Sequence, residues 1–132
     1  MPVKLALLTF LLATSAAVAE TPTANLTIRN RVFEPKEVNV PAGQKTLRIA
    51  LCYSDFPGRG LINNLNLIVT SPTGKKAVGN QPSGSSSLTL DSANNVEVVE
   101  VPKAKSGTWT VDVVASNIAK GPQDFAIAAV LV

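Results

Sequence analysis

The chain of 132 residues contains no histidine and a single cysteine, Cys52. The absence of histidine excludes a Ser-His-Asp triad, a Cys-His dyad and His-ligated zinc or copper. A single cysteine excludes an internal disulfide, and a cysteine without a base beside it is a poor nucleophile. We therefore expect a protein that is not an enzyme, with Cys52 as a free thiol.

Charged and aromatic residues are also scarce, at 16% and 5% of the chain. The basic residues are scattered, so they form no phosphate-binding track, and the aromatic residues are too few for base stacking. We expect no nucleic acid partner. The acidic residues are dispersed as well, and their spacing indicates no acid/base pair. We expect most of them to be solvated surface charges.

One continuous apolar run lies near the N-terminus, where Lys4 precedes residues 5–13 and small residues follow at 17–19. This order is typical of an export signal. The run is too short to span a bilayer comfortably, and no later stop-transfer segment follows. We predict a signal peptide at 1–19 and a single secreted or periplasmic domain at 20–132, without membrane contact after cleavage. An uncleaved anchor is the alternative.

Proline, glycine, asparagine and serine interrupt the mature chain at short intervals, and no window shows a sustained 3.6-residue apolar period. Segments between them read as strands, beginning at Leu26–Ile28. Apolar and polar residues alternate most clearly over 47–53 and 108–113, as in strands with one buried face. We predict an all-β fold, a two-sheet antiparallel sandwich that is jelly-roll-like, with eight or nine strands.

Two stretches interrupt this regular pattern. Residues 79–87 are rich in glycine and serine, which predicts a long surface loop. Residues 95–101 shift their apolar phase midway, which predicts a β-bulge.

Five motifs follow one another over residues 38–132: LRIALCYSDFPG, LINNLNLIVTSPTGKK, NNVEVVEV, SGTWTVDVVASNI and GPQDFAIAAV. Their order and spacing resemble the C-terminal β-sandwich of subtilisin-like serine proteases, which follows the catalytic domain in many extended members. The resemblance implies a jelly-roll-like accessory module that contacts or stabilises a protein partner, such as a protease. It does not imply proteolysis, because these motifs do not belong to the catalytic domain.

Domains of that family commonly carry calcium. Asp55 and Asp91 keep acidic positions of the family pattern, whereas Asn64 and Asn66 stand where the family tends to have aspartate. Calcium takes about six to eight oxygen ligands, and asparagine supplies an oxygen without charge. The resemblance therefore implies a weak calcium region at these four residues. The favoured alternative is that the two asparagines only hydrogen-bond an adjacent loop.

Residues 25–45, NLTIRNRVFEPKEVNVPAGQK, resemble the first two strands of a secreted cupredoxin. A copper site of that type needs two histidines and a cysteine, usually with a methionine. The chain has no histidine and its only methionine is Met1. We expect no copper.

A module that binds an extracellular polymer, such as a glycan, is the second functional class. Exposed aromatic side chains would favour it. Tyr53, Trp109 and Phe125 are in phase with the core residues of their strands, which leaves Phe33 and Phe56 as surface candidates. We rank the accessory module first.

The same alternation places Cys52 on the strand face opposite Leu47, Ile49 and Leu51. If these three face the core, Cys52 lies on the outer face. A free thiol in an oxidising compartment can link two chains, so we predict a Cys52-linked dimer.

Overall fold

A computed structural model describes residues 6–12, 36–43 and 45–132 of the chain. All regular structure in these residues is β-strand, and none of it is a helix that could cross a membrane. The strands are β1 (Ala6–Leu12), β2 (Lys36–Val40), β3 (Leu47–Cys52), β4 (Asn63–Thr70), β5 (Lys76–Val78), β6 (Val96–Val101), β7 (Gly107–Ile118) and β8 (Phe125–Leu131).

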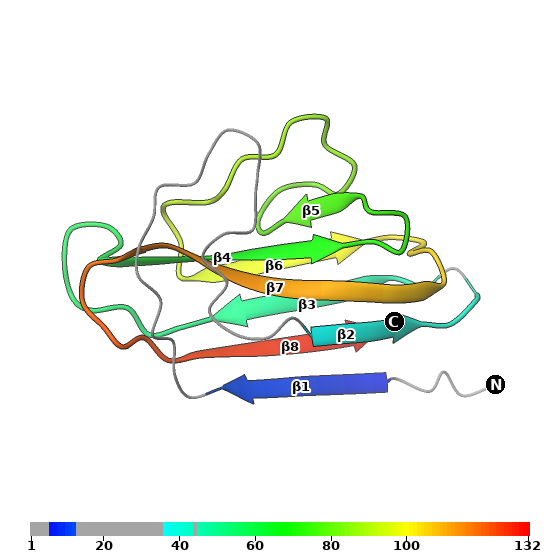
Figure 1. Cartoon of the computed structure of the whole chain (residues 1–132), viewed down its shortest axis with the longest axis horizontal. Helices are drawn as coiled ribbons and strands as arrows, with labels where there is room; N and C mark the ends of the chain where they lie inside the picture. The colour runs from blue at the N-terminus through cyan, green and yellow to red at the C-terminus, as the bar shows by residue number, and fades with distance from the viewer. Residues whose placement is uncertain (1–5, 13–35, 44) are drawn as a thin grey trace.

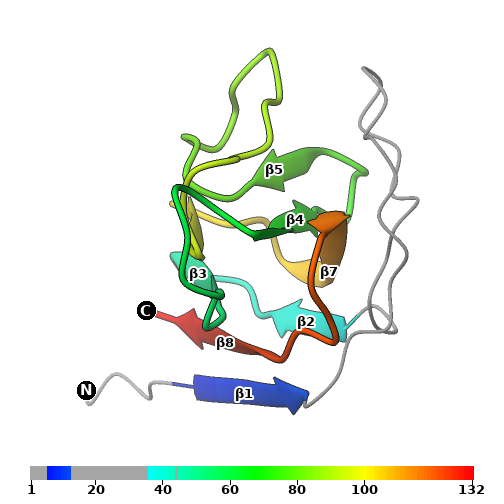
Figure 2. The same cartoon turned by 90° about the vertical axis from the view of Figure 1, so that its left-hand side faces the viewer.

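The strands form two four-stranded sheets in which every pair is antiparallel (Figures 1 and 2). Sheet A has the order β1-β8-β3-β6, and sheet B has the order β2-β7-β4-β5. Consecutive strands lie in different sheets at every step except the β4–β5 hairpin and are therefore joined across the sandwich. Two interleaved antiparallel sheets with eight strands in total form a jelly roll. The predicted all-β sandwich is confirmed.

Seven of the eight described strands lie between Lys36 and Leu131. The strand predicted at 26–28 lies outside the described residues. The eighth strand, β1, falls within the predicted signal peptide and pairs antiparallel with β8 over its full length of seven residues. The sequence pattern predicts only an export signal for this apolar run. In the structure the run is also the edge strand of sheet A.

The core lies between the two sheets and is built by the alternation of the strands. Leu47, Ile49 and Leu51 of β3 share one buried cluster with Leu65 and Leu67 of β4, and none of these five side chains has exposed area. Full burial of an aliphatic side chain of this size contributes about 1.5–3 kcal/mol. The inner faces of β3 and β4 therefore hold the two sheets together.

Tyr53, Trp109 and Phe125 are 3%, 4% and 3% exposed and belong to this core, as predicted. Their buried polar atoms have partners. The Tyr53 hydroxyl donates to the backbone oxygen of Asn63 at 3.0 Å, and Trp109 Nε1 donates to the backbone oxygen of Lys105 at 2.8 Å. Burial is the main reason why the pKa of Tyr53 rises to about 12.

The outer face of sheet B is covered by the loop between β5 and β6. Ile68, Val78 and Val114 form a second buried cluster, and Leu88 and Leu90 of the loop pack against it. The segment predicted as a surface loop therefore continues into an apolar anchor, which fixes its position on the sheet.

Strand β6 contains no bulge. Its pairing with β3 is regular from Leu47 opposite Val101 to Cys52 opposite Val96. The apolar phase shifts because Glu97 points inward while Val96 and Val98 point outward. The prediction of a bulge here was wrong, and the register shift of the fold lies instead in β4, between Asn64 and Leu65.

Candidate functional site

The residues of the predicted calcium region lie in three different settings. Asp55 belongs to the loop between β3 and β4. Its Oδ2 accepts a hydrogen bond from the backbone N–H of Ile62 at 2.7 Å, and its Oδ1 accepts one from Asn63 at 2.9 Å. The two carboxylate oxygens thus fix the end of the loop, at Ile62, and the first residue of β4, Asn63.

Asn64 and Asn66 lie on the outer face of β4. The Asn66 Nδ2 donates to Asn64 Oδ1 at 3.0 Å and to the Ser116 hydroxyl of β7 at 2.7 Å. Asn66 has no exposed area, and its Oδ1 has no hydrogen-bond partner. The pair therefore joins two strands of sheet B, instead of the adjacent loop that the sequence alternative named.

The neighbouring Asn63 is the residue that fixes a loop. It is fully buried, and its Nδ2 donates to Lys120 O at 2.6 Å and to Gln123 Oε1 at 2.9 Å, while its Oδ1 accepts from Lys120 N at 3.0 Å. Gln123 Nε2 in turn donates to Ser54 O at 2.9 Å. This network ties the β7–β8 loop to the β3–β4 loop at one end of the sandwich.

Asp91 lies in the β5–β6 loop. Its Oδ1 accepts from the backbone N–H groups of Ala93 and Asn94 at 2.7 and 3.1 Å, and its Oδ2 accepts from the side-chain amides of Asn80 and Asn94 at 2.6 and 2.7 Å. Burial alone would raise the pKa of Asp91, but the hydrogen bonds from Asn80 and Asn94 hold it below its ordinary value. This carboxylate is charged and organises the loop.

The structure brings Asn64 and Asn66 into contact, and it gives Asp55 and Asp91 separate sets of hydrogen bonds in separate loops. Across the described ranges, no three Asp, Glu or Cys side chains gather as candidate metal ligands. Of the four predicted calcium ligands, the two that lie together are the amide oxygens of Asn64 and Asn66. Asn66 Oδ1 has no hydrogen-bond partner. Weak calcium binding remains a prediction.

Glu97 departs from the expectation that acidic residues are solvated. It has no exposed area and reaches from β6 in sheet A to β4 in sheet B, where its Oε2 accepts the backbone N–H of Leu67 at 2.7 Å. Its Oε1 has no partner. Burial and, to a smaller extent, the charge of Asp91 raise the pKa of Glu97 to about 8, against the opposing effect of the Leu67 hydrogen bond. The carboxyl group is therefore mostly neutral at pH 7.

Gly79 leaves the space that Glu97 occupies. A Cβ at Gly79 would overlap the carboxyl group and the Cβ of Glu97. The backbone N–H of Gly79 also donates to Leu67 O at 3.0 Å. The backbone N–H of Leu67 thus bonds to the Glu97 carboxyl group, and its carbonyl oxygen bonds to the N–H of Gly79.

Cys52 is exposed at the end of β3, on the outer face of sheet A that alternation predicts. The register places it beside Val96 of β6 and Ala126 of β8. Val96 and Val98 are 46% and 41% exposed. The thiol therefore lies on an open face of mainly small apolar side chains, accessible to reagents and to a second thiol.

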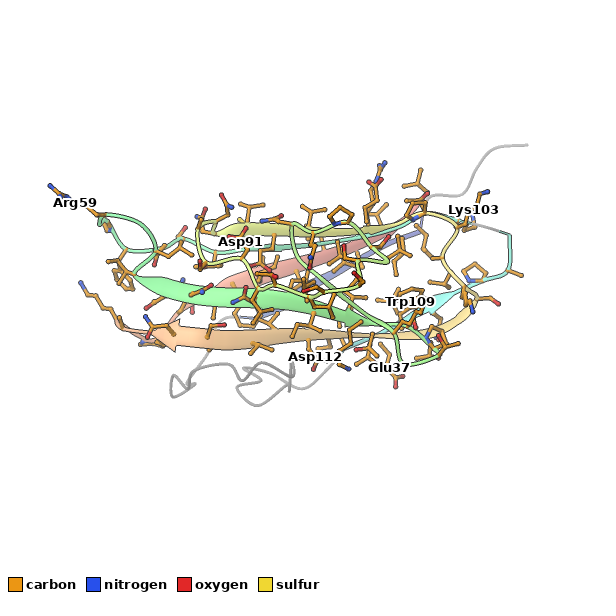
Figure 3. All side chains as sticks on the ribbon, turned by 90° about the horizontal axis from the view of Figure 1, so that it is seen from above. Glu37, Arg59, Asp91, Lys103, Trp109 and Asp112 are labelled. Atoms are coloured by element: carbon orange, nitrogen blue, oxygen red, sulfur yellow. The ribbon has the colours of Figure 1, made fainter. Side chains whose placement is uncertain are left out.

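A pocket with a volume of about 500 Å³ opens between the β4–β5 hairpin, the β5–β6 loop and the β6–β7 turn. Among the described residues, its lining includes Lys75, Lys76, Lys103 and Lys105, several serines and Trp109, and no acidic residue. We call it the lysine pocket. Lys103 and Trp109 lie at the same end of the sandwich, opposite Arg59 (Figure 3).

The lysine pocket has a consistent positive charge. Lys75, Lys103 and Lys105 are exposed, and the Lys76 ammonium lies 3.5 Å from the Thr70 hydroxyl. A concave site lined by charges of one sign raises the local concentration of oppositely charged ligands. In chemical terms the pocket fits an anionic group flanked by hydrogen-bonding atoms, because serine hydroxyls lie among the ammonium groups.

In the sequence these four lysines look scattered. The available signal was positional, because two of them follow the SPTG turn and two precede the SG turn. In the jelly roll the two turns lie at one end of the sandwich, so the four residues meet. The inward phase of Glu97 is visible in the sequence of β6, where regular alternation and a β-bulge both explain it.

Comparison with family models finds no match to the chain, and comparison with curated proteins finds none either. The fold defines a class, the antiparallel jelly-roll sandwich. Function must therefore be argued from the lysine pocket and from the hydrogen bonds that use the polar side chains.

Proposed function

We propose that the protein is a secreted, non-catalytic interaction module that contacts or stabilises a protein partner, and that the lysine pocket receives an acidic segment of that partner. The observation that carries the proposal is a pocket to which the described part of the chain contributes four lysines and no acidic residue. The order of the sequence motifs, which resembles the subtilase C-terminal domain, supports an accessory role with a protease as the partner.

The hydrogen bonds and the burial of the polar groups support the proposal that the module is non-catalytic. Asp55 and Asp91 accept hydrogen bonds from the backbone, and Glu97 is buried beneath a loop. The chain has no histidine. We expect purified protein to cleave casein no faster than a heat-killed sample. Cleavage that disappears when one residue of this chain is changed would contradict the proposal.

Glycan binding ranks second because open aromatic faces are lacking among the residues whose side chains the structure describes. Tyr53, Trp109 and Phe125 are buried. The partly exposed Phe56 is covered by the ammonium group of Lys120, 4.6 Å from the ring centroid. The other surface candidate, Phe33, lies outside the described residues.

The binding proposal is tested with polyglutamate as a probe. Lys103→Glu reverses one charge of the pocket and should weaken binding about tenfold, the equivalent of about 1.4 kcal/mol. Arg59→Glu is the matched control, because it causes the same change in net charge at an exposed position at the opposite end of the sandwich. The control should bind as the wild type does.

Equal weakening by both variants would mean that net charge, not the pocket, attracts the probe, and would overturn the proposal. Dextran sulfate serves as the second arm. If it binds through Lys103 and polyglutamate does not, the glycan alternative replaces the protein partner. The partner itself is then sought by pull-down from the secreted fraction with wild type and Lys103→Glu in parallel.

A further inference from the structure

Strand β8 has a neighbour on each side in the structure, β3 and β1 (Figures 1 and 2). The β1 pairing runs from Ala6 opposite Leu131 to Leu12 opposite Phe125. β1 therefore satisfies the outward backbone groups of β8. It also lies entirely within residues 1–19, which are predicted to be removed on export. The mature chain would then carry β8 as a bare edge of sheet A.

The sequence of β8, FAIAAVL, suits pairing with another strand. It has no charged residue and no proline, and its register with β3 is regular. Edge strands usually carry charges, prolines or bulges that prevent pairing with other chains. The other three edge strands of the sandwich each carry charged residues: Lys36 and Glu37 in β2, Lys76 in β5, and Glu97 and Glu100 in β6.

We infer that a second copy of the mature chain pairs with this edge, β8 against β8, across a two-fold axis at Ala128. In that register Phe125 of one copy lies opposite Leu131 of the other. The second β8 thus replaces β1 position for position, since β1 also pairs antiparallel over these seven residues. Because side chains alternate with a period of two, the core-side residues of both strands remain on the core side.

The chain offers a poorer occupant elsewhere. The strand predicted at 26–28 has three residues and is followed by Arg29 and Arg31. The predicted strand is four residues shorter than β8 and would leave part of the edge unpaired, whereas a second β8 pairs with all seven positions. A two-fold pairing of identical strands is also self-complementary, so it closes after two copies. Sheet A would then continue across the dimer in the order β6-β3-β8-β8-β3-β6.

This dimer does not need Cys52. The thiol lies on β3, one strand inside the edge, so about three strand spacings, roughly 14 Å, separate the two thiol-bearing strands. A disulfide requires Cα atoms about 4.4–6.8 Å apart. The edge dimer therefore forms under reducing conditions, which separates it from a Cys52-linked dimer.

The test uses protein exported and processed by a host cell, with cleavage verified by mass. In reductant, light scattering should give twice the monomer mass. Ala128→Lys and Ala128→Glu each place like charges opposite one another at the axis and should weaken the dimer at least tenfold. An equimolar mixture of the two variants should restore it as a heterodimer.

Ala50→Lys is the matched control. Ala50 lies opposite Ala128 in the register, on the same half-buried outer face, but on the inner strand β3. It should leave the dimer intact. Dissociation by Ala50→Lys would show that the copies contact one another through the outer face of sheet A and not through the β8 edge, and would overturn the inference. So would a monomeric processed chain, a product that retains residues 1–19, or a mixture that fails to reassociate while both variants keep the wild-type circular dichroism.

Discussion

At the scale of single residues, polar side chains here mostly replace backbone partners that the strands cannot supply. Asp55 accepts from Ile62, and Glu97 accepts from Leu67. Asn80, with a positive φ of 59°, accepts from the Val98 N–H at 3.0 Å through its side chain and donates to the Val98 carbonyl at 2.9 Å through its backbone. Buried backbone groups need such partners. Loss of one of these side chains should therefore appear as loop opening.

Glu97 makes folding stability depend on pH. Its ordinary pKa is 4.5, and burial raises the folded value to about 8. Between these values the folded protein holds a proton that the unfolded chain has lost, so stability is full below pH 4.5 and falls as pH rises through 8. We expect urea unfolding to show that the free energy of unfolding falls with rising pH from pH 5 to 8, most steeply near pH 6, by about 1.4 kcal/mol per pH unit.

Glu97→Gln should remove that slope, because a neutral amide keeps an oxygen for the Leu67 N–H without titrating. Glu100→Gln is the control, on the same strand but 51% exposed and paired with Arg48. It should leave the slope in place. The shifts of Asp91 and Tyr53 act below about pH 4 and above about pH 10, outside this interval. An unchanged slope in Glu97→Gln would contradict the assignment.

The hydrogen-bonded pair Asn64 and Asn66 gives a second prediction at the scale of residues. Asn64→Asp with Asn66→Asp removes the donors that bond Asn64 and Ser116 and places two carboxylates on one strand face. Without metal this should cost a few kcal/mol. If the region binds calcium, the ion should restore stability by roughly 2.7 kcal/mol at 100 times Kd, or about 4 °C in Tm.

Thermal unfolding with and without millimolar calcium measures this effect. Wild-type protein should show little stabilisation, because the amides carry no charge. Asn39→Asp, at an exposed site of sheet B, controls for nonspecific calcium effects. A double variant whose Tm ignores calcium would assign the asparagines to strand linkage alone, and strong stabilisation of the wild type would contradict a weakened site.

At the scale of strands, sequence predicted what one strand determines by itself. The alternation of β3 gave its buried face, and turn residues gave the β4–β5 hairpin. What it missed depends on pairing between distant segments. The inward carboxyl of Glu97 is tolerated because Leu67 on another sheet donates to it, and the lysines meet because two turns share one end. The sequence around Glu97 does not show that Leu67 lies near it, and the sequence around one pair of lysines does not show the other pair.

The open face of sheet A yields a prediction for Cys52. An exposed thiol beside small residues is free to approach another copy. We expect aged, non-reduced samples to contain a disulfide-linked dimer on denaturing gels, which Cys52→Ser abolishes. Ser54, exposed and two residues further on, provides the matched control as Ser54→Ala. Native protein that resists thiol reagents completely would show that Cys52 is not accessible.

For the whole molecule, the interleaved strand order makes most pairings distant in sequence. β3 pairs with β8 so that Cys52 lies opposite Ala126, and β4 and β5 are the only described strands that form a hairpin. Folds dominated by such pairings fold slowly, in milliseconds to seconds. We expect stopped-flow refolding in this range, followed by the fluorescence of the single, buried Trp109. Microsecond refolding would contradict this topology.

The position of β8 also sets an order of events during synthesis. Of the described strands, β8 is the last to be made, yet it lies inside sheet A between β1 and β3. At about 5–20 residues per second, the ribosome needs on the order of ten seconds to pass from Leu12 to Phe125. During that time the N-terminal apolar run has no partner strand in sheet A. If this run is an export signal, as its sequence predicts, an export receptor has access to it before β8 is made.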